Sequence, residues 1–349
     1  MRRILTVGML LACLAPAAQA EIALSGTLRN DVLVLVRGDR GYVFDLLEQQ
    51  LVLTRRADLW RFYGDVRVNL VEGEVDALRP EGDAGQRFGV RLLRGFVRYY
   101  PDAGSITLGK TYVNFGAPGV FNPFELDRTV YATDLDYTKE GVLALTCEAP
   151  LGPLSGWQVF ASPEAGRAAA AAGAGAYTHA GTFALGAVVQ RRDRDENVAG
   201  VYLQGDLEVG VRASWAYHAD DRGGRGWSEA EAGVDYSFWD GRILAGVQGL
   251  YREGRAEADA GTPAARADLG AAPLGFTDRW YAYANLRWVP DEFFQAGVDA
   301  FVNAEDGSAL LIPGATWVLA DGMSLTLQAL VPTGGVDRQY SRALFGDAP

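Results

Sequence analysis

Apolar and polar side chains alternate along most of the chain after residue 20. In 59–71 the even positions are mainly apolar, whereas the odd positions between them are polar and include Arg61 and Arg67. A period of two residues places the two sets on opposite faces of a β-strand. The pattern therefore predicts an all-β protein, and it recurs in 207–218, 227–238, 280–288, 294–303 and 323–331.

The lengths of the strands and of their connections point to a barrel. The alternating segments are about ten residues long, which is the length that crosses a bilayer at a tilt of roughly 45°. Tight turns such as Asp240-Gly241 and Asp321-Gly322 alternate with long polar connections at 72–87, 116–138 and 253–278. Short turns on one rim and long loops on the other are typical of an outer-membrane barrel. We therefore expect a single antiparallel transmembrane β-barrel.

The pattern supports about eighteen strands, and sixteen are an alternative because the first, second and last segments are weakly patterned. The last of the eighteen would cover 336–345. An even number of strands would bring both ends of the barrel to the periplasmic rim. Trp280 and Trp288 lie eight residues apart on one face of a predicted strand, so they could belong to the two aromatic girdles.

Two other architectures compete with this prediction. A water-soluble exported β-sandwich or β-helix also alternates, but it turns its apolar face inward and its charged face to water. An α-helical membrane protein would need the uncharged stretch 168–190, which is long enough to span a bilayer. That stretch contains four glycines and alternates again after a turn-like centre, so we interpret it as two strands joined by a turn.

The N-terminus resembles a secretory signal peptide. Two arginines precede the apolar run 4–18, and Ala18-Gln19-Ala20 offers small residues to a signal peptidase. We predict cleavage after Ala20, so that residues 1–20 are a signal peptide and 21–349 form the barrel. An alternative is a lipoprotein box at Leu10-Leu11-Ala12-Cys13, in which Cys13 would be lipidated.

Charge and cysteine content exclude several functions. The 44 acidic residues outnumber the 32 basic ones, two of which lie in the predicted signal peptide, so the net charge becomes still more negative after cleavage. This acidity argues against nucleic acid as a partner. Cys147 is the one cysteine expected in the mature chain, so an intrachain disulfide cannot form.

Candidate functional residues cluster between 61 and 138. A barrel of 16 to 18 strands is too wide to be filled by side chains, so function is sought along its lumen. Arg94 and Arg98 share a predicted strand face with Phe96, and Lys110 lies in the next predicted strand, 105–115. The connection that follows, 116–138, is stiffened by two prolines and carries four acids, Glu125, Asp127, Asp134 and Asp136.

The segment 94–127 resembles a pattern in large bacterial porin-like families. Leu108-Gly109-Lys110 and Asn114-Phe115-Gly116, followed by Asn122-Pro123, carry this resemblance over about a tenth of the chain. It implies a passive uptake channel narrowed by a folded-in loop. Its constriction would set the basic Arg61, Arg67, Arg94, Arg98 and Lys110 against the acidic Glu125, Asp127, Asp134 and Asp136. The alternative is a loop that projects outward while the arginines pair within the wall.

An enzyme is a weaker interpretation. Tyr217-His218-Ala219-Asp220-Asp221 ends a predicted strand, where omptin-type proteases place carboxylates and a histidine. No second carboxylate pair matches it, and the predicted strand count is too large for that family. His179 and His218 are far apart, and there is no Gly-x-Ser-x-Gly or phosphate-binding loop. We therefore expect neither an enzyme nor a bound cofactor or metal.

The sequence thus predicts an outer-membrane channel for passive diffusion of small polar solutes or ions. Whether it prefers cations or anions is left open. Its expected partners are outer-membrane lipid, the barrel-assembly machinery during insertion and, in a homo-oligomer, further copies of the chain. The second hypothesis is a surface-exposed binding or adhesion protein anchored by an occluded barrel.

Overall fold

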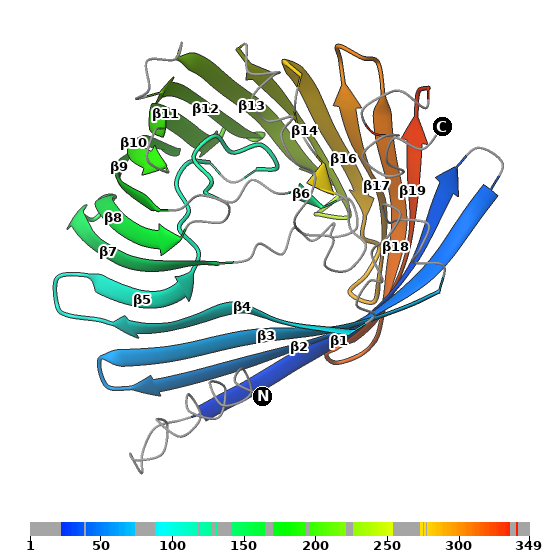
Figure 1. Cartoon of the computed structure of the whole chain (residues 1–349), viewed down its shortest axis with the longest axis horizontal. Helices are drawn as coiled ribbons and strands as arrows, with labels where there is room; N and C mark the ends of the chain where they lie inside the picture. The colour runs from blue at the N-terminus through cyan, green and yellow to red at the C-terminus, as the bar shows by residue number, and fades with distance from the viewer. Residues whose placement is uncertain are drawn as a thin grey trace.

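The computed structural model is a closed β-barrel (Figure 1). It describes residues 22–37, 40–73, 88–117, 119–126, 130–131, 141–164, 170–192, 196–220, 226–253, 273–274, 276, 278–335 and 340. Within these ranges no helix is long and apolar enough to cross a membrane. The predicted signal peptide lies outside the described residues, as do most of the residues after Gly335.

Within the described residues seventeen strands form the barrel, a number between the sixteen and the eighteen that the sequence pattern supports. They are β1 (Ile22–Arg37), β2 (Arg40–Ala57), β3 (Trp60–Gly73), β4 (Phe88–Tyr99), β5 (Ser105–Thr111), β7 (Val142–Gly152), β8 (Ser155–Glu164), β9 (Ala171–Ala180), β10 (Phe183–Arg192), β11 (Glu196–Asp206), β12 (Gly210–Asp220), β13 (Trp227–Phe238), β14 (Ile243–Arg252), β16 (Trp280–Trp288), β17 (Phe294–Asn303), β18 (Ala309–Ala320) and β19 (Met323–Thr333). Two short strands, β6 (Val130–Tyr131) and β15 (Pro273–Leu274), pair with each other and connect two long loops.

The barrel closes through a parallel pair of strands. Neighbours along the chain are antiparallel, but β1 meets β19 in parallel, from Leu28 opposite Met323 to Leu35 opposite Leu330. Closing an odd number of up-and-down strands requires one such pair. The expectation that both ends of the barrel share a rim is therefore wrong: β1 begins at one rim and β19 ends at the other. The predicted strand 336–345 lies outside the described residues except for Tyr340, which is not in a strand.

The two rims differ in the length of their connections. The short-turn rim carries tight connections such as 58–59, 153–154, 181–182 and 321–322. The long-loop rim carries the connections 112–141 and 253–279. In outer-membrane barrels the short turns are periplasmic and the long loops extracellular. The stretch 168–190 is confirmed as two strands, β9 and β10, joined by the turn at 181–182.

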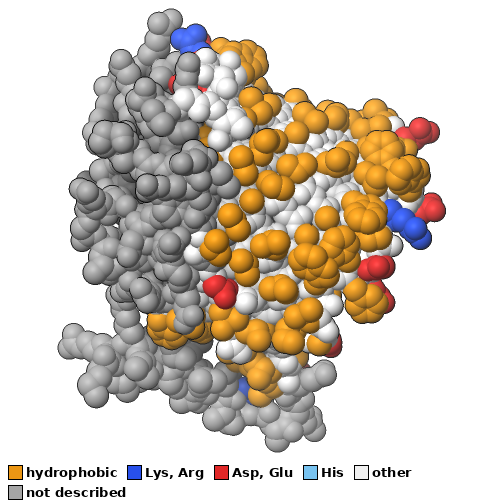
Figure 2. Space-filling view, turned by 90° about the vertical axis from the view of Figure 1, so that its right-hand side faces the viewer, with side chains coloured by type: hydrophobic (Ala, Val, Ile, Leu, Met, Phe, Trp, Pro, Cys, Tyr) orange, Lys and Arg blue, Asp and Glu red, His pale blue; other side chains and the backbone are white. Residues whose placement is uncertain are grey.

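The outer face of the barrel is apolar. Figure 2 shows apolar side chains spread over one side of it, with charged side chains mostly near an edge. Trp280 is 53% exposed where β16 begins at the long-loop rim, and Trp288 is 50% exposed where β16 ends at the short-turn rim. An apolar band with aromatic residues at both rims is suited to lipid contact. Polar residues such as Asp65 and Gln248 are buried on the inner face, so the soluble β-sandwich is not supported.

Candidate functional site

The chain leaves β5 at Thr111, earlier than predicted, and residues 112–117 and 119–126 run inside the barrel (Figure 1). We call this segment the lumen loop. Its side chains Val113, Phe115 and Phe124 are buried against apolar residues that face inward from β7 to β12. Apolar burial of this kind holds a loop against a wall without directional bonds. The wall residues are Val142, Ala144, Phe160, Ala171, Val188, Val198 and Ala216.

Hydrogen bonds fix the lumen loop at two points of the wall. On β14, the Gln248 side-chain amide donates to the Phe121 carbonyl at 2.9 Å and accepts from the Val120 amide at 2.9 Å. On β10, Gln190 Nε2 donates to the Phe124 carbonyl at 3.0 Å. Arg192, also on β10, donates from Nη2 to the Pro123 carbonyl at 2.9 Å. These side chains satisfy loop carbonyls that would otherwise be buried without partners.

Small residues and Asn122 shape the loop itself. Asn122 Nδ2 donates to the Phe115 carbonyl at 2.8 Å, and the Phe124 amide donates to Asn122 Oδ1 at 3.0 Å. Gly116 has φ +88°, a conformation that favours glycine. A Cβ on Gly119 would lie 2.6 Å from Gln248 Nε2, so a side chain there would displace the anchor.

A second apolar cluster occupies the lumen beside β14 to β19. Three segments that are not in the wall contribute to it: Phe121 of the lumen loop, Phe276 of the loop before β16, and Tyr340 near the C-terminus. The Phe121 and Phe276 rings meet edge-on with centroids 5.1 Å apart. Burial raises the pKa of the Tyr340 hydroxyl, so this group remains neutral. The inward-facing wall residues of the cluster are Leu250, Tyr281, Tyr283, Phe301, Leu310, Ile312 and Leu330.

The opposite side of the lumen carries arginines. We call the inner face of β3 and β4 the basic wall. Arg61 and Arg67 face inward from β3, as predicted, and Arg94 and Arg98 face inward from β4, where Arg98 lies opposite Arg61. Arg91 lies opposite Arg67 and also faces inward, and it was not among the predicted site residues.

A β-bulge explains the additional arginine. The register of β3 against β4 shifts between Asp65 and Val66, which leaves Leu93 as the extra residue in β4. Arg91 and Arg94 are three residues apart and would lie on opposite faces of a regular strand. The bulge brings both to the lumen.

Acidic partners hold part of the basic wall. Arg94 forms two hydrogen bonds with Asp65, and Arg67 pairs with Glu48 of β2 at 3.0 Å. Arg98 Nε donates to Thr107 at 2.8 Å, and its Nη1 lies 3.6 Å from Glu148. These carboxylates were not among the predicted site residues. Asp65 lies directly opposite Arg94 on the neighbouring strand, a signal that becomes available once the strand register is known.

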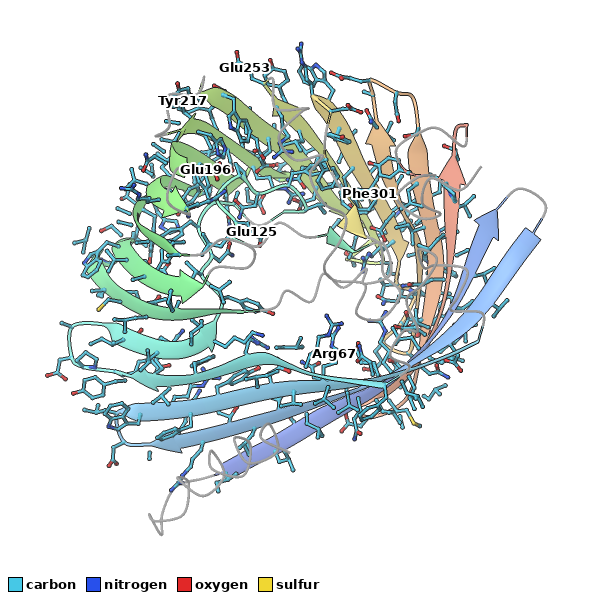
Figure 3. The ribbon with its side chains drawn as sticks, in the orientation of Figure 1. Arg67, Glu125, Glu196, Tyr217, Glu253 and Phe301 are labelled. Atoms are coloured by element: carbon cyan, nitrogen blue, oxygen red, sulfur yellow. The ribbon has the colours of Figure 1, made fainter. Side chains whose placement is uncertain are left out.

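The other predicted residues are placed differently. Lys110 pairs across strands with Leu143, which is exposed on the outer face, so its backbone position is on that face, and its Nζ donates to the Leu92 carbonyl. The grouping of Lys110 with the lumen arginines is thereby corrected. Glu125 lies on the lumen loop, across the lumen from Arg67 in the view of Figure 3. Asp127, Asp134 and Asp136 lie outside the described residues.

His218 is not part of an open rim site. It is 1% exposed and stacks on Trp227 with ring centroids 3.7 Å apart. Its Nδ1 lies 2.8 Å from a Glu196 oxygen, and its Nε2 lies 3.6 Å from Glu229. Among the residues that the structure describes, no group of three or more histidines, cysteines and acids is arranged to hold a metal ion.

Comparison with known proteins identifies the fold. No protein-family model and no curated protein matches the sequence. OmpF of Salmonella typhi, solved in complex with daunomycin, is 14% identical, with 81% of this chain and 90% of OmpF covered and a TM-score of 0.50. A variant of the Rhodopseudomonas blastica porin is 13% identical, with 84% and 99% covered and a TM-score of 0.51. OccK5 of Pseudomonas aeruginosa is 9% identical, with 86% and 88% covered and a TM-score of 0.50.

Likeness at these identities is a likeness of fold. The chain is a porin-like transmembrane β-barrel, the architecture of bacterial outer-membrane proteins. The resemblance drawn from the segment 94–127 is thus confirmed at the level of the fold.

Proposed function

We propose that this barrel is a passive diffusion channel for small polar solutes or ions, with its constriction between the lumen loop and the basic wall. The observation that carries the proposal is the position of the lumen loop. Gln190, Arg192 and Gln248 anchor it to β10 and β14, on the side of the barrel away from β3 and β4. A loop held inside a wide barrel narrows its lumen without closing it.

The exposure of side chains supports a route along the basic wall. The two apolar clusters bury their side chains almost completely on the side of β7 to β19. In contrast, the Arg94 and Arg98 side chains are 28% and 27% exposed, and Tyr112 is 37% exposed. A polar solute following these groups would exchange water for hydrogen bonds to the wall.

The charge balance supports a preference for anions. Five arginines face the lumen from the basic wall, and hydrogen bonds or ion pairs connect them to three carboxylates, Glu48, Asp65 and Glu148. Acids on the far wall are engaged by other groups: Glu231 accepts from Ser214 and Gln248, and Asp235 pairs with Arg212. Among the described residues, the charge of the basic wall is therefore net positive, which would attract anions.

Planar-bilayer recording of the refolded mature chain tests this function. A channel gives discrete openings that scale with salt, and its reversal potential in a KCl gradient reports anion preference. Arg91→Gln removes a cation of the basic wall and should shift selectivity toward cations. Lys110→Gln removes the same charge from the outer face and should leave selectivity unchanged. Silence from a folded, inserted barrel would reject the channel in favour of an anchor for binding loops.

A further inference from the structure

Three arginines form one row across neighbouring strands. Arg56 of β2 lies opposite Arg61 of β3, and Arg61 lies opposite Arg98 of β4. Directly paired residues share a face, so all three backbone positions face the lumen. Adjacent strands are about 4.8 Å apart, so the row spans roughly 10 Å. We call these residues the arginine row.

The row lies at the short-turn rim. Arg61 is the second residue of β3, and Arg98 is the last but one of β4. Along β3, Arg61 and Asp65 are four residues apart, a distance of roughly 13 Å. The arginine row is therefore separate from the level at which the Arg94–Asp65 pair lies.

Like charges placed directly opposite each other destabilise a sheet. In the described part of the chain, the row makes one ion pair, between Arg98 and Glu148 at 3.6 Å. Arg56 is exposed, and Arg61 lies over the Tyr63 ring at 5.6 Å. Within the described residues, the fold thus places three arginines at this mouth and pairs one of them, Arg98, with a carboxylate.

Aromatic rings orient two of the guanidinium groups. The Arg98 guanidinium lies 5.4 Å from the centre of the Phe96 ring, and Phe96 stacks on Tyr63 at 5.0 Å and 15°. A guanidinium placed over a ring keeps its N–H groups available at its edge, where they can bind an oxyanion. Each such charge-assisted bond is stronger than a neutral one.

We propose that the arginine row is a binding site for organic anions that carry two or more acidic groups. A solute with one carboxylate can neutralise one guanidinium, whereas closely spaced carboxylates or phosphates can engage several at once. The inference rests on the proposed channel for its role in transport, since such a site would load or release solutes at the short-turn mouth. Binding itself does not require conduction.

Citrate and acetate are the probes. Isothermal titration calorimetry of the detergent-folded mature barrel should show citrate binding about tenfold tighter than acetate at equal ionic strength, because several charged contacts add. In bilayers, citrate should interrupt the KCl current at lower concentration than acetate. The double variant Arg56→Gln/Arg61→Gln should weaken both effects at least about tenfold. It should still fold, since it removes like-charge repulsion.

Arg212→Gln is the matched control. Arg212 lies near the same rim on β12, where it pairs with Asp235 at 3.1 Å, and its loss should leave citrate affinity within about twofold. Equal citrate affinity in the wild type and the double variant would overturn the arginine row, as would equal affinity for citrate and acetate. If the barrel binds citrate but conducts no current, the binding site stands and the channel is rejected. Failure of the site and failure of the channel can therefore be told apart.

Discussion

Arg94 holds the buried carboxylate of Asp65 from the neighbouring strand. Its Nε and Nη2 donate to the same Asp65 oxygen at 3.0 and 2.7 Å, and the other oxygen accepts from Gln50 at 2.8 Å. Asp65 is 0% exposed, whereas the Arg94 side chain keeps 28%. Arg94 also lies over the rings of Tyr63 and Tyr112, at 4.8 and 4.9 Å. The pair therefore connects β3, β4 and the start of the lumen loop.

Removing Arg94 should destabilise the barrel more than removing any unpaired arginine of the wall. Arg94→Ala leaves a buried carboxylate without its cation, which costs about 3 kcal/mol, the lower end for buried pairs because Arg94 is partly exposed. Arg91→Ala, two positions before the bulge residue Leu93, should cost less than about 1 kcal/mol. Urea unfolding of the refolded barrel, followed by tryptophan fluorescence, measures both. Equal losses would show that Asp65 does not depend on Arg94.

The anchor on β14 should control how steadily the channel conducts. Gln248→Ala removes the three hydrogen bonds that hold Val120 and Phe121, so the lumen loop should move and the single-channel current should become noisier, with a larger mean. Gln328→Ala truncates another buried glutamine that faces the lumen from β19, away from the loop anchors. If the Gln248→Ala current is no noisier than that of the control, Gln248 does not hold the lumen loop in position.

Gly119→Ala should reproduce the loss of the Gln248 anchor. The new Cβ would lie 2.6 Å from Gln248 Nε2, which is closer than van der Waals contact allows. Gly249→Ala is the matched control, because its Cβ would meet nothing within 4 Å. The double variant Gly119→Ala/Gln248→Ala should conduct like either single variant, since the added methyl group and the truncated side chain act on one contact. Additive effects on current noise would contradict this shared contact.

Alternation predicted the wall of the barrel well because each strand has one face in lipid and one in the lumen. The odd positions of β3, including Arg61, Asp65 and Arg67, face inward as their spacing indicates. The same rule places Lys110 on the outer face, because it lies two residues after Leu108 and four after Ile106, which are both exposed. Parity is a local property, so a reader of the sequence can use it without knowing the register.

Bulges and long loops are where that rule ends. Arg91 was missed because one extra residue, Leu93, reverses the parity of β4. Gln248 contacts the lumen loop across 127 positions of sequence, and Arg192 contacts it across 69. Alternation shows that both side chains face the lumen but not what they meet there. The odd strand count likewise depends on the parallel pairing of β1 with β19. The alternation within a single strand does not indicate which strand it pairs with.

The outer face offers the most direct test of how the barrel sits in the membrane. Val247 is 53% exposed near the middle of β14 and pairs with Val234 and Ala284 on its two neighbours. Val247→Arg places a charge near the centre of the hydrocarbon layer and should cost about 2–4 kcal/mol of stability in lipid vesicles. Leu207→Arg, in the exposed turn between β11 and β12, should cost less than about 1 kcal/mol, because charge near the interface is tolerated. Both are measured by urea unfolding in vesicles. Similar costs at the two positions would mean that the middle of β14 does not lie in the hydrocarbon layer.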